Sequence, residues 1–204
     1  MRRDEGMDTD MDAAETDALR AGTWTLLGRL LTEPPSAALR QRLAEVGASG
    51  DDADPLAAAW ARLAAAARSA RDDALKREFH DVFVGVGGGE VNPYASWYLA
   101  GALADRPLVE LRGELEALGV VRRDGCSEPE DHAAAVCETM ALAILDEAVD
   151  AAWQQALFAR HADSWMGRFF DDLEQAPSAH FYRAVAALGR AFLALERRFH
   201  AMPA

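Results

Sequence analysis

The residue types best suited to chemistry are concentrated in one short stretch of the chain, Ser127-Glu128-Pro129-Glu130-Asp131-His132. Ser127 and Glu130 are spaced as a capping box, in which each side chain bonds a backbone N–H of the other at a helix start. His132 follows Glu128 by four positions, so on a helix these two side chains share a face. Asp131 and His132 would project from the helix start, where a carboxylate and an imidazole could receive a backbone N–H or a cationic partner.

Enzymatic chemistry is a poorer interpretation of the same stretch. Three neighbouring carboxylates could in principle perform acid–base work, but their attraction to the positive end of a helix dipole explains them with fewer assumptions. The five histidines are scattered, no GxSxG sequence occurs, and Cys137 lies on the predicted core face. The sequence therefore predicts a protein that is not an enzyme and that holds no metal or other cofactor.

Composition and charge restrict the possible partners. Half of the residues are apolar, with many Ala and Leu, which favours helices. The formal net charge is −13 and the isoelectric point is about 4.7, whereas nucleic-acid binding needs a basic surface. A cationic peptide would suit an acidic surface, although the same charge would also serve solubility alone.

The chain start and the cysteines indicate the compartment. Arg2 and Arg3 are followed by Asp4 and Glu5 rather than by an apolar segment, so this is not a secretion signal. No apolar run approaches the length of a membrane span, and Cys126 and Cys137 suggest no disulfide framework. We expect a cytoplasmic protein that does not insert into a membrane.

Hydrophobic periodicity predicts an all-α fold. Residues 1–15 are acidic and are predicted to form a disordered tail. Residues 16–204 are predicted to form one all-helical domain, a bundle of roughly eight to ten helices, with its first helix over residues 16–32. The clearest helix is the last one, whose seam comprises Phe181, Val185, Leu188, Phe192, Leu195 and Phe199.

Two features lie between the predicted helices. The glycine run from Gly85 to Gly89 lacks the Gly-Lys-Ser/Thr ending of a phosphate-binding loop, so a flexible hinge or loop is the better interpretation. Tyr94, Trp97 and Tyr98 follow Asn92-Pro93. They are aromatic core residues with polar rims, or they line a groove for a peptide.

Three stretches, in order, resemble the TorD/DmsD-type chaperones that mature molybdenum-containing redox enzymes. Residues 127–132 are similar to the E-P-x-D-H signature of that family. Residues 78–101 resemble its aromatic helix, glycine loop, proline and paired aromatics, and residues 157–193 resemble its C-terminal H-x-x-x-W segment and final helix. The similar segments cover about residues 70–195.

The resemblance implies a cytoplasmic chaperone that binds a twin-arginine signal peptide and the apo form of a molybdopterin oxidoreductase. It also implies the use of family positions for peptide contact. Carried over by motif, the peptide-binding residues are Phe79, Val82, Pro93, Tyr94, Ser96, Tyr98, Glu128, Pro129, Asp131 and His132. Asp131 would meet the arginines, and the aromatic side chains would accept the apolar segment of the peptide. A monomer and a domain-swapped homodimer are both compatible with the family.

Two alternatives remain open on the sequence. A helical scaffold or oligomerisation protein without a peptide groove would bury the rings of Tyr94 and Tyr98 and use Asp131 only as a helix cap. A nucleotide hydrolase would use the glycine run over residues 85–89. The sequence does not identify the client enzyme.

Overall fold

The computed structural model describes residues 4–46, 54–117, 119 and 129–202, and for residues 4–13 the backbone alone. These residues form helices and no strand, which confirms the predicted all-α class. The helices are α1 (Asp4–Thr32), α2 (Ala37–Glu45), α3 (Pro55–Ser69), α4 (Asp72–Phe79), α5 (Ala95–Ala100), α6 (Arg106–Ala117), α7 (Ala133–Leu145), α8 (Ala151–Leu157), α9 (Met166–Gln175) and α10 (Phe181–His200). Two π-helical segments, His80–Val84 and Phe158–Asp163, continue α4 and α8.

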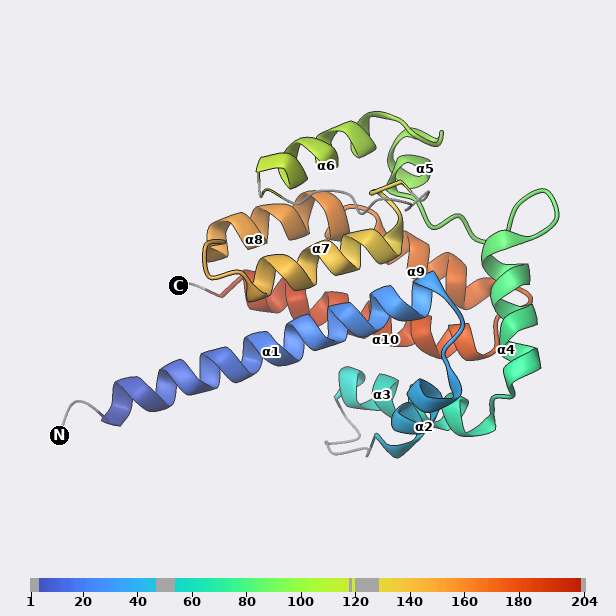
Figure 1. The fold of residues 1–204 in the computed structure, drawn as a ribbon, viewed down its shortest axis with the longest axis horizontal. Helices are drawn as coiled ribbons and strands as arrows, with labels where there is room; N and C mark the ends of the chain where they lie inside the picture. Colours follow the sequence, from blue (N-terminus) through green and yellow to red (C-terminus); the bar gives the residue numbers. More distant parts are fainter. Residues whose placement is uncertain (1–3, 47–53, 118, 120–128, 203–204) are drawn as a thin grey trace.

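The helices surround a centre formed by α1, α7, α9 and α10 (Figure 1). α1 lies along α7, and α10 packs against both α9 and α3. α5 and α6 lie together on the far side of α7 from α1. None of the helices in the described ranges is both long enough and apolar enough to cross a membrane.

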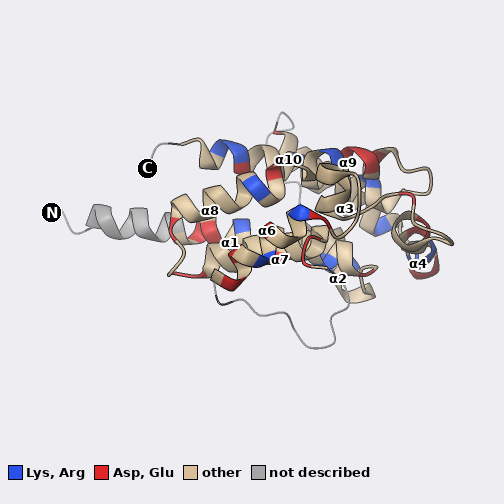
Figure 2. Cartoon of the chain, turned by 90° about the horizontal axis from the view of Figure 1, so that it is seen from above, with Lys and Arg blue, Asp and Glu red and all other residues tan. Residues whose placement is uncertain are grey.

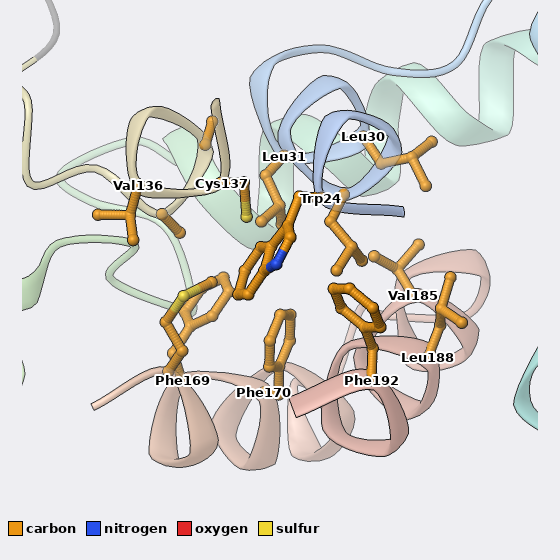
Figure 3. Close-up of a cluster of buried hydrophobic side chains, with 14 of the residues drawn as sticks. Trp24, Leu30, Leu31, Val136, Cys137, Phe169, Phe170, Val185, Leu188 and Phe192 are labelled. Carbon is orange, nitrogen blue, oxygen red and sulfur yellow. The ribbon is translucent and has the colours of Figure 1, made fainter. Parts of the chain in front are cut away.

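The core is organised around Trp24 of α1, which is fully buried (Figure 3). Its indole contacts the ring of Phe192 edge-on at a centroid distance of 5.1 Å, and the ring of Phe158 at 6.4 Å. Phe169 and Phe170 of α9 close the same cluster. Burying one large apolar side chain contributes about 1.5–3 kcal/mol, so these rings bind α1 to the C-terminal helices.

A buried ion pair lies next to this aromatic cluster. Glu196 of α10 has no exposed side chain surface and accepts hydrogen bonds from Arg20 Nε at 2.7 Å and Trp24 Nε1 at 3.1 Å. Arg20 also pairs with Asp17 at 2.8 Å and stacks on the ring of Phe199. Because a buried charge is costly unless it is paired, α1 and α10 are held in one register.

Several helix starts follow local sequence signals. The Ser36 side chain accepts a hydrogen bond from Leu39 N–H at the start of α2, and Asp54 accepts one from Leu56 N–H at the start of α3, with Pro55 in the first turn. Ser and Asp are preferred residues at this position of a helix, and Pro suits its first turn. Gly119 follows α6 with φ of +68°, as expected of a residue that ends a helix.

The start of α1 differs from the prediction. α1 begins at Asp4, so the backbone of residues 4–15, predicted as a disordered tail, is helical and extends away from the other helices (Figure 1). Lengthening an existing helix fixes one residue per added hydrogen bond and needs no new nucleus. Leu19 is 67% exposed, because the buried side of α1 runs through Trp24 and Leu27.

Gly189 of α10 allows α9 to pack closely against α10. A substitution at Gly189 tests this packing. A Cβ at this position would overlap the ring of Phe170. We expect Gly189→Ala to lower the free energy of unfolding by about 1–3 kcal/mol. Gly113→Ala, at an exposed position in α6 with open space around it, is the control and should stabilise by about 0.5–1 kcal/mol. Urea unfolding monitored by circular dichroism measures both, and equal effects would contradict this packing.

His200 gives a prediction for pH dependence. Burial lowers its pKa, and the nearby Glu196 carboxylate only partly opposes this. The unfolded chain therefore binds a proton more readily, so stability is full above the ordinary histidine pKa of about 6.5 and is lost as pH falls below it. We expect His200→Gln to flatten thermal stability between about pH 7 and 5, relative to the unmutated chain. A parallel decline in both proteins would contradict the role of His200.

Candidate functional site

Two segments distant in sequence meet at a short backbone bridge between Tyr94 and His132. Ala95 N–H donates to the carbonyl of Asp131 at 2.9 Å, and Ala133 N–H donates to the carbonyl of Pro93 at 2.7 Å. The Tyr94 and His132 rings contact edge-on with centroids 5.1 Å apart. The bridge therefore joins the start of α5 to the start of α7.

The start of α7 differs from the prediction. The capping box at Ser127 predicted a helix with Pro129 in its first turn, but α7 begins at Ala133. The cap is His132, whose Nδ1 accepts a hydrogen bond from Ala134 N–H at 3.1 Å. Residues 129–132 instead approach α5, because the bridge satisfies backbone groups that a longer helix would have used internally. Ser127 and Glu128 lie outside the described residues.

A pocket of about 320 Å³ opens beside this bridge. Four predicted site residues line it together: Phe79, Pro93, Tyr94 and His132. The other lining residues come from the end of α1, the π-helical segment after α4, and the first half of α7: Leu31, Thr32, Phe83, Val84, Ala134, Ala135 and Glu138. The structure thus brings Pro93 and Tyr94 of the aromatic stretch and His132 of the acidic motif to one pocket.

The walls of the pocket are largely apolar. The ring centroids of Phe79 and Phe83 lie 5.1 Å apart, and both rings pack against the ring of Tyr182 of α10. This contact with Tyr182 holds the two rings in position. Val84 is 52% exposed. An open apolar surface of this kind suits an apolar side chain of a ligand.

The polar features of the pocket favour a cation. Glu138 is exposed and is the only acidic residue among the pocket's lining residues. Leu31 and Thr32 belong to the last turn of α1, where the helix dipole places negative partial charge. Gly28 lets α1 come close to α7 here, because a Cβ would lie 3.2 Å from the carbonyl oxygen of Ala134.

Four other predicted site residues do not line this pocket. Val82 is fully buried, and Ser96 and Asp131 are buried beneath the bridge. Tyr98 packs towards α9, with its ring 5.5 Å from that of Trp165 and its hydroxyl donating to Asp172 at 2.8 Å. Burial, followed by this hydrogen bond, raises the pKa of Tyr98 above its usual value.

The remaining motif residues contact α6 or lie at the edge of the bridge. Pro129 is partly buried, and its carbonyl accepts the N–H of His132 at 3.1 Å. Glu130 accepts a hydrogen bond from Arg112 Nε of α6 at 2.9 Å, and Arg112 Nη2 forms an ion pair with the same carboxylate oxygen at 2.8 Å. This hydrogen bond raises the pKa of Arg112. The motif therefore connects α6 with α5 and α7.

The glycine run forms a tight loop against the end of α4. Glu90 N–H donates to the carbonyl of Asp81 at 3.2 Å, and Val91 N–H donates to that of Val82 at 2.9 Å. Gly85 has φ of +54°, and a Cβ there would overlap the backbone of Gly88. The glycines are therefore required by this return of the chain.

Several charged side chains of α9 and α10 form ion pairs. On α9 and α10, basic and acidic residues lie side by side (Figure 2). Arg190 pairs with Asp171 and Glu174, and Arg197 pairs with Asp163. Within the described ranges, no group of three or more His, Cys, Asp and Glu is arranged to hold a metal ion. The thiol of Cys137 is fully buried, which raises its pKa and makes it a poor nucleophile.

Sequence reasoning missed Glu138, Phe83 and Val84 as pocket residues. Glu138 carried one signal, since it is the only charged residue in α7. A single charge on an otherwise apolar helix marks the side that meets water, although it does not tell which neighbouring segments meet there.

Comparison with known proteins places the chain in a family. The family described as nitrate reductase delta subunit matches residues 49–171, more than half of the chain, and the chain belongs to it. The protein named "Chaperone protein TorD" from two strains of Vibrio cholerae serotype O1 is 30% identical over 129 residues. That match covers 58% of this chain and 59% of the relative. The TorD-type family predicted from the sequence is confirmed.

The His132 cap can be tested by stability alone. His132→Ala removes the acceptor for the Ala134 N–H, and we expect it to lower the free energy of unfolding by about 1 kcal/mol. His132→Asn keeps a side-chain acceptor and should retain most of the stability. Chemical denaturation of both variants measures the difference. Equal stability of His132→Ala and the unmutated chain would show that the cap contributes nothing.

Proposed function

We propose that this chain is a cytoplasmic chaperone, and not an enzyme, that binds a twin-arginine signal peptide in the pocket beside the Tyr94–His132 bridge. Its client is the immature catalytic subunit of a molybdopterin oxidoreductase, whose cofactor insertion it assists and whose export it delays. The observation that carries the proposal is the pocket itself, in which apolar walls adjoin one exposed carboxylate. Family membership and the similarity to a TorD chaperone support it.

The two parts of the pocket correspond to the two parts of such a peptide. A twin-arginine signal has a basic start followed by an apolar segment. The apolar walls at Phe79, Phe83 and Val84 would take an apolar side chain, and burying it would supply affinity. Glu138 and the C-terminal end of α1 would attract an arginine by charge-assisted contact.

The scaffold alternative requires a surface without a groove. It expects the rings of Tyr94 and Tyr98 to be fully buried, whereas both are only partly buried. It also expects Asp131 to cap its own helix, whereas His132 caps α7. These observations favour the peptide-binding proposal.

Titration calorimetry with a synthetic twin-arginine signal peptide at two salt concentrations tests the charge contribution. We expect binding to weaken with salt, because salt screens exposed charge pairs. Glu138→Gln should reduce affinity about three- to tenfold at low salt and should flatten the salt dependence. Glu147→Gln, an exposed carboxylate between α7 and α8, is the matched control and should bind as the unmutated chain does.

Two exposed valines test the apolar contribution separately. Val84 lines the pocket, whereas Val86, two residues later, does not and is fully exposed. We expect Val84→Ser to weaken peptide binding about threefold at both salt concentrations and Val86→Ser to have no effect. If neither substitution at Val84 or Glu138 changes binding, the peptide binds elsewhere. If the folded, unmutated chain does not bind the peptide at all, the proposed function fails.

A further inference from the structure

Asp131 makes a deeply buried polar contact behind the pocket. Its side chain is 1% exposed and that of Ser96 is 0% exposed. Asp131 Oδ2 accepts hydrogen bonds from Ser96 N–H at 3.0 Å and from Ser96 Oγ at 2.5 Å. Neither residue lines the pocket.

We infer that Asp131 is a positioning residue, which fixes one wall of the pocket through Ser96, and is not the carboxylate that receives the cation of the peptide. This inference rests on the proposed function for its effect on binding, but its structural part can be tested without a peptide.

Asp131 holds the first turn of α5 through three groups. Its carbonyl accepts Ala95 N–H, and its carboxylate accepts both the N–H and the hydroxyl of Ser96. The first N–H groups of a helix have no partner within the helix, and the residue at the cap position of α5, Tyr94, makes no side-chain cap. Asp131, which belongs to another segment of the chain, therefore takes the place of the side-chain cap that α5 lacks.

These three hydrogen bonds, which we call the Asp131 clamp, determine where two pocket residues lie. Tyr94 directly precedes the clamped turn of α5, and His132 directly follows Asp131. Their rings contact at 5.1 Å and line the pocket together. If these hydrogen bonds of Asp131 are lost, the separation of the two rings changes.

Burial argues against a direct role for Asp131 in binding a cation. One carboxylate oxygen is occupied by Ser96, and the other is buried with no hydrogen-bond partner in the described part of the chain. A guanidinium would have to leave water to reach it, and this loss of hydration opposes binding before any attraction is gained. Glu138 is exposed among the residues that line the pocket and needs no such desolvation.

Three substitutions separate positioning from direct binding in titrations with the synthetic twin-arginine peptide. Asp131→Asn keeps an oxygen that can accept both Ser96 bonds, so positioning predicts affinity within about threefold of the unmutated chain and the same salt dependence. Asp131→Ala and Ser96→Ala lose bonds to the clamp and should weaken binding about tenfold. Ser69→Ala, whose hydroxyl bonds only carbonyls of its own helix, is the matched control and should leave affinity unchanged.

Direct binding predicts the opposite pattern. Asp131→Asn would then weaken binding as much as Asp131→Ala and would flatten the salt dependence, whereas Ser96→Ala would leave affinity unchanged. That result would overturn the inference.

Nuclear magnetic resonance of the His132 ring gives a readout that needs no peptide. The ring current of Tyr94 shifts the His132 ring protons at the observed contact distance. We expect Ser96→Ala to move these signals and Asp131→Asn to leave them nearly in place. Unchanged signals in Ser96→Ala and in folded Asp131→Ala would overturn the positioning role, whether or not the peptide binds. If the unmutated chain fails to bind the peptide, the proposed function falls, and these signals alone decide the positioning role.

Discussion

Two backbone hydrogen bonds, from Ala95 to Asp131 and from Ala133 to Pro93, are the constraint on which the candidate site depends. They bring together two segments that are separated in sequence by α6. α7, which begins directly after the bridge, packs closely on α1, and Gly28 permits this approach. The pocket forms where the end of α1, the bridge and the π-helical segment after α4 converge.

Much of the fold could be predicted because its signals are local or periodic. The seam of α10 follows from its apolar spacing, and the caps at Ser36 and Asp54 act within one helical turn. The start of α7 could not be predicted in the same way. A capping box at Ser127 competes with the long-range pairing of residues 131–133, and a local pattern carries no information about a partner more than thirty residues away.

The candidate site was predicted in part. The resemblance to a family indicated residues 79–98 and 128–132, and the structure places Phe79, Pro93, Tyr94 and His132 in one pocket. The resemblance could not tell which motif residues face the pocket and which are buried behind it, because that depends on how α5 and α7 meet. Tyr98 and Asp131 are of the right type for peptide contact, but their hydrogen bonds to Asp172 and Ser96 occupy them within the fold.

We propose above all that a signal peptide binds at the pocket beside the bridge. Photo-crosslinking tests it most directly, with a diazirine residue placed in the apolar segment of a twin-arginine signal peptide and the attachment site identified by mass spectrometry. We expect attachment to the pocket walls, within residues 79–84 or 132–138. Attachment confined to α9 and α10, or saturable binding without attachment to either pocket segment, would contradict it.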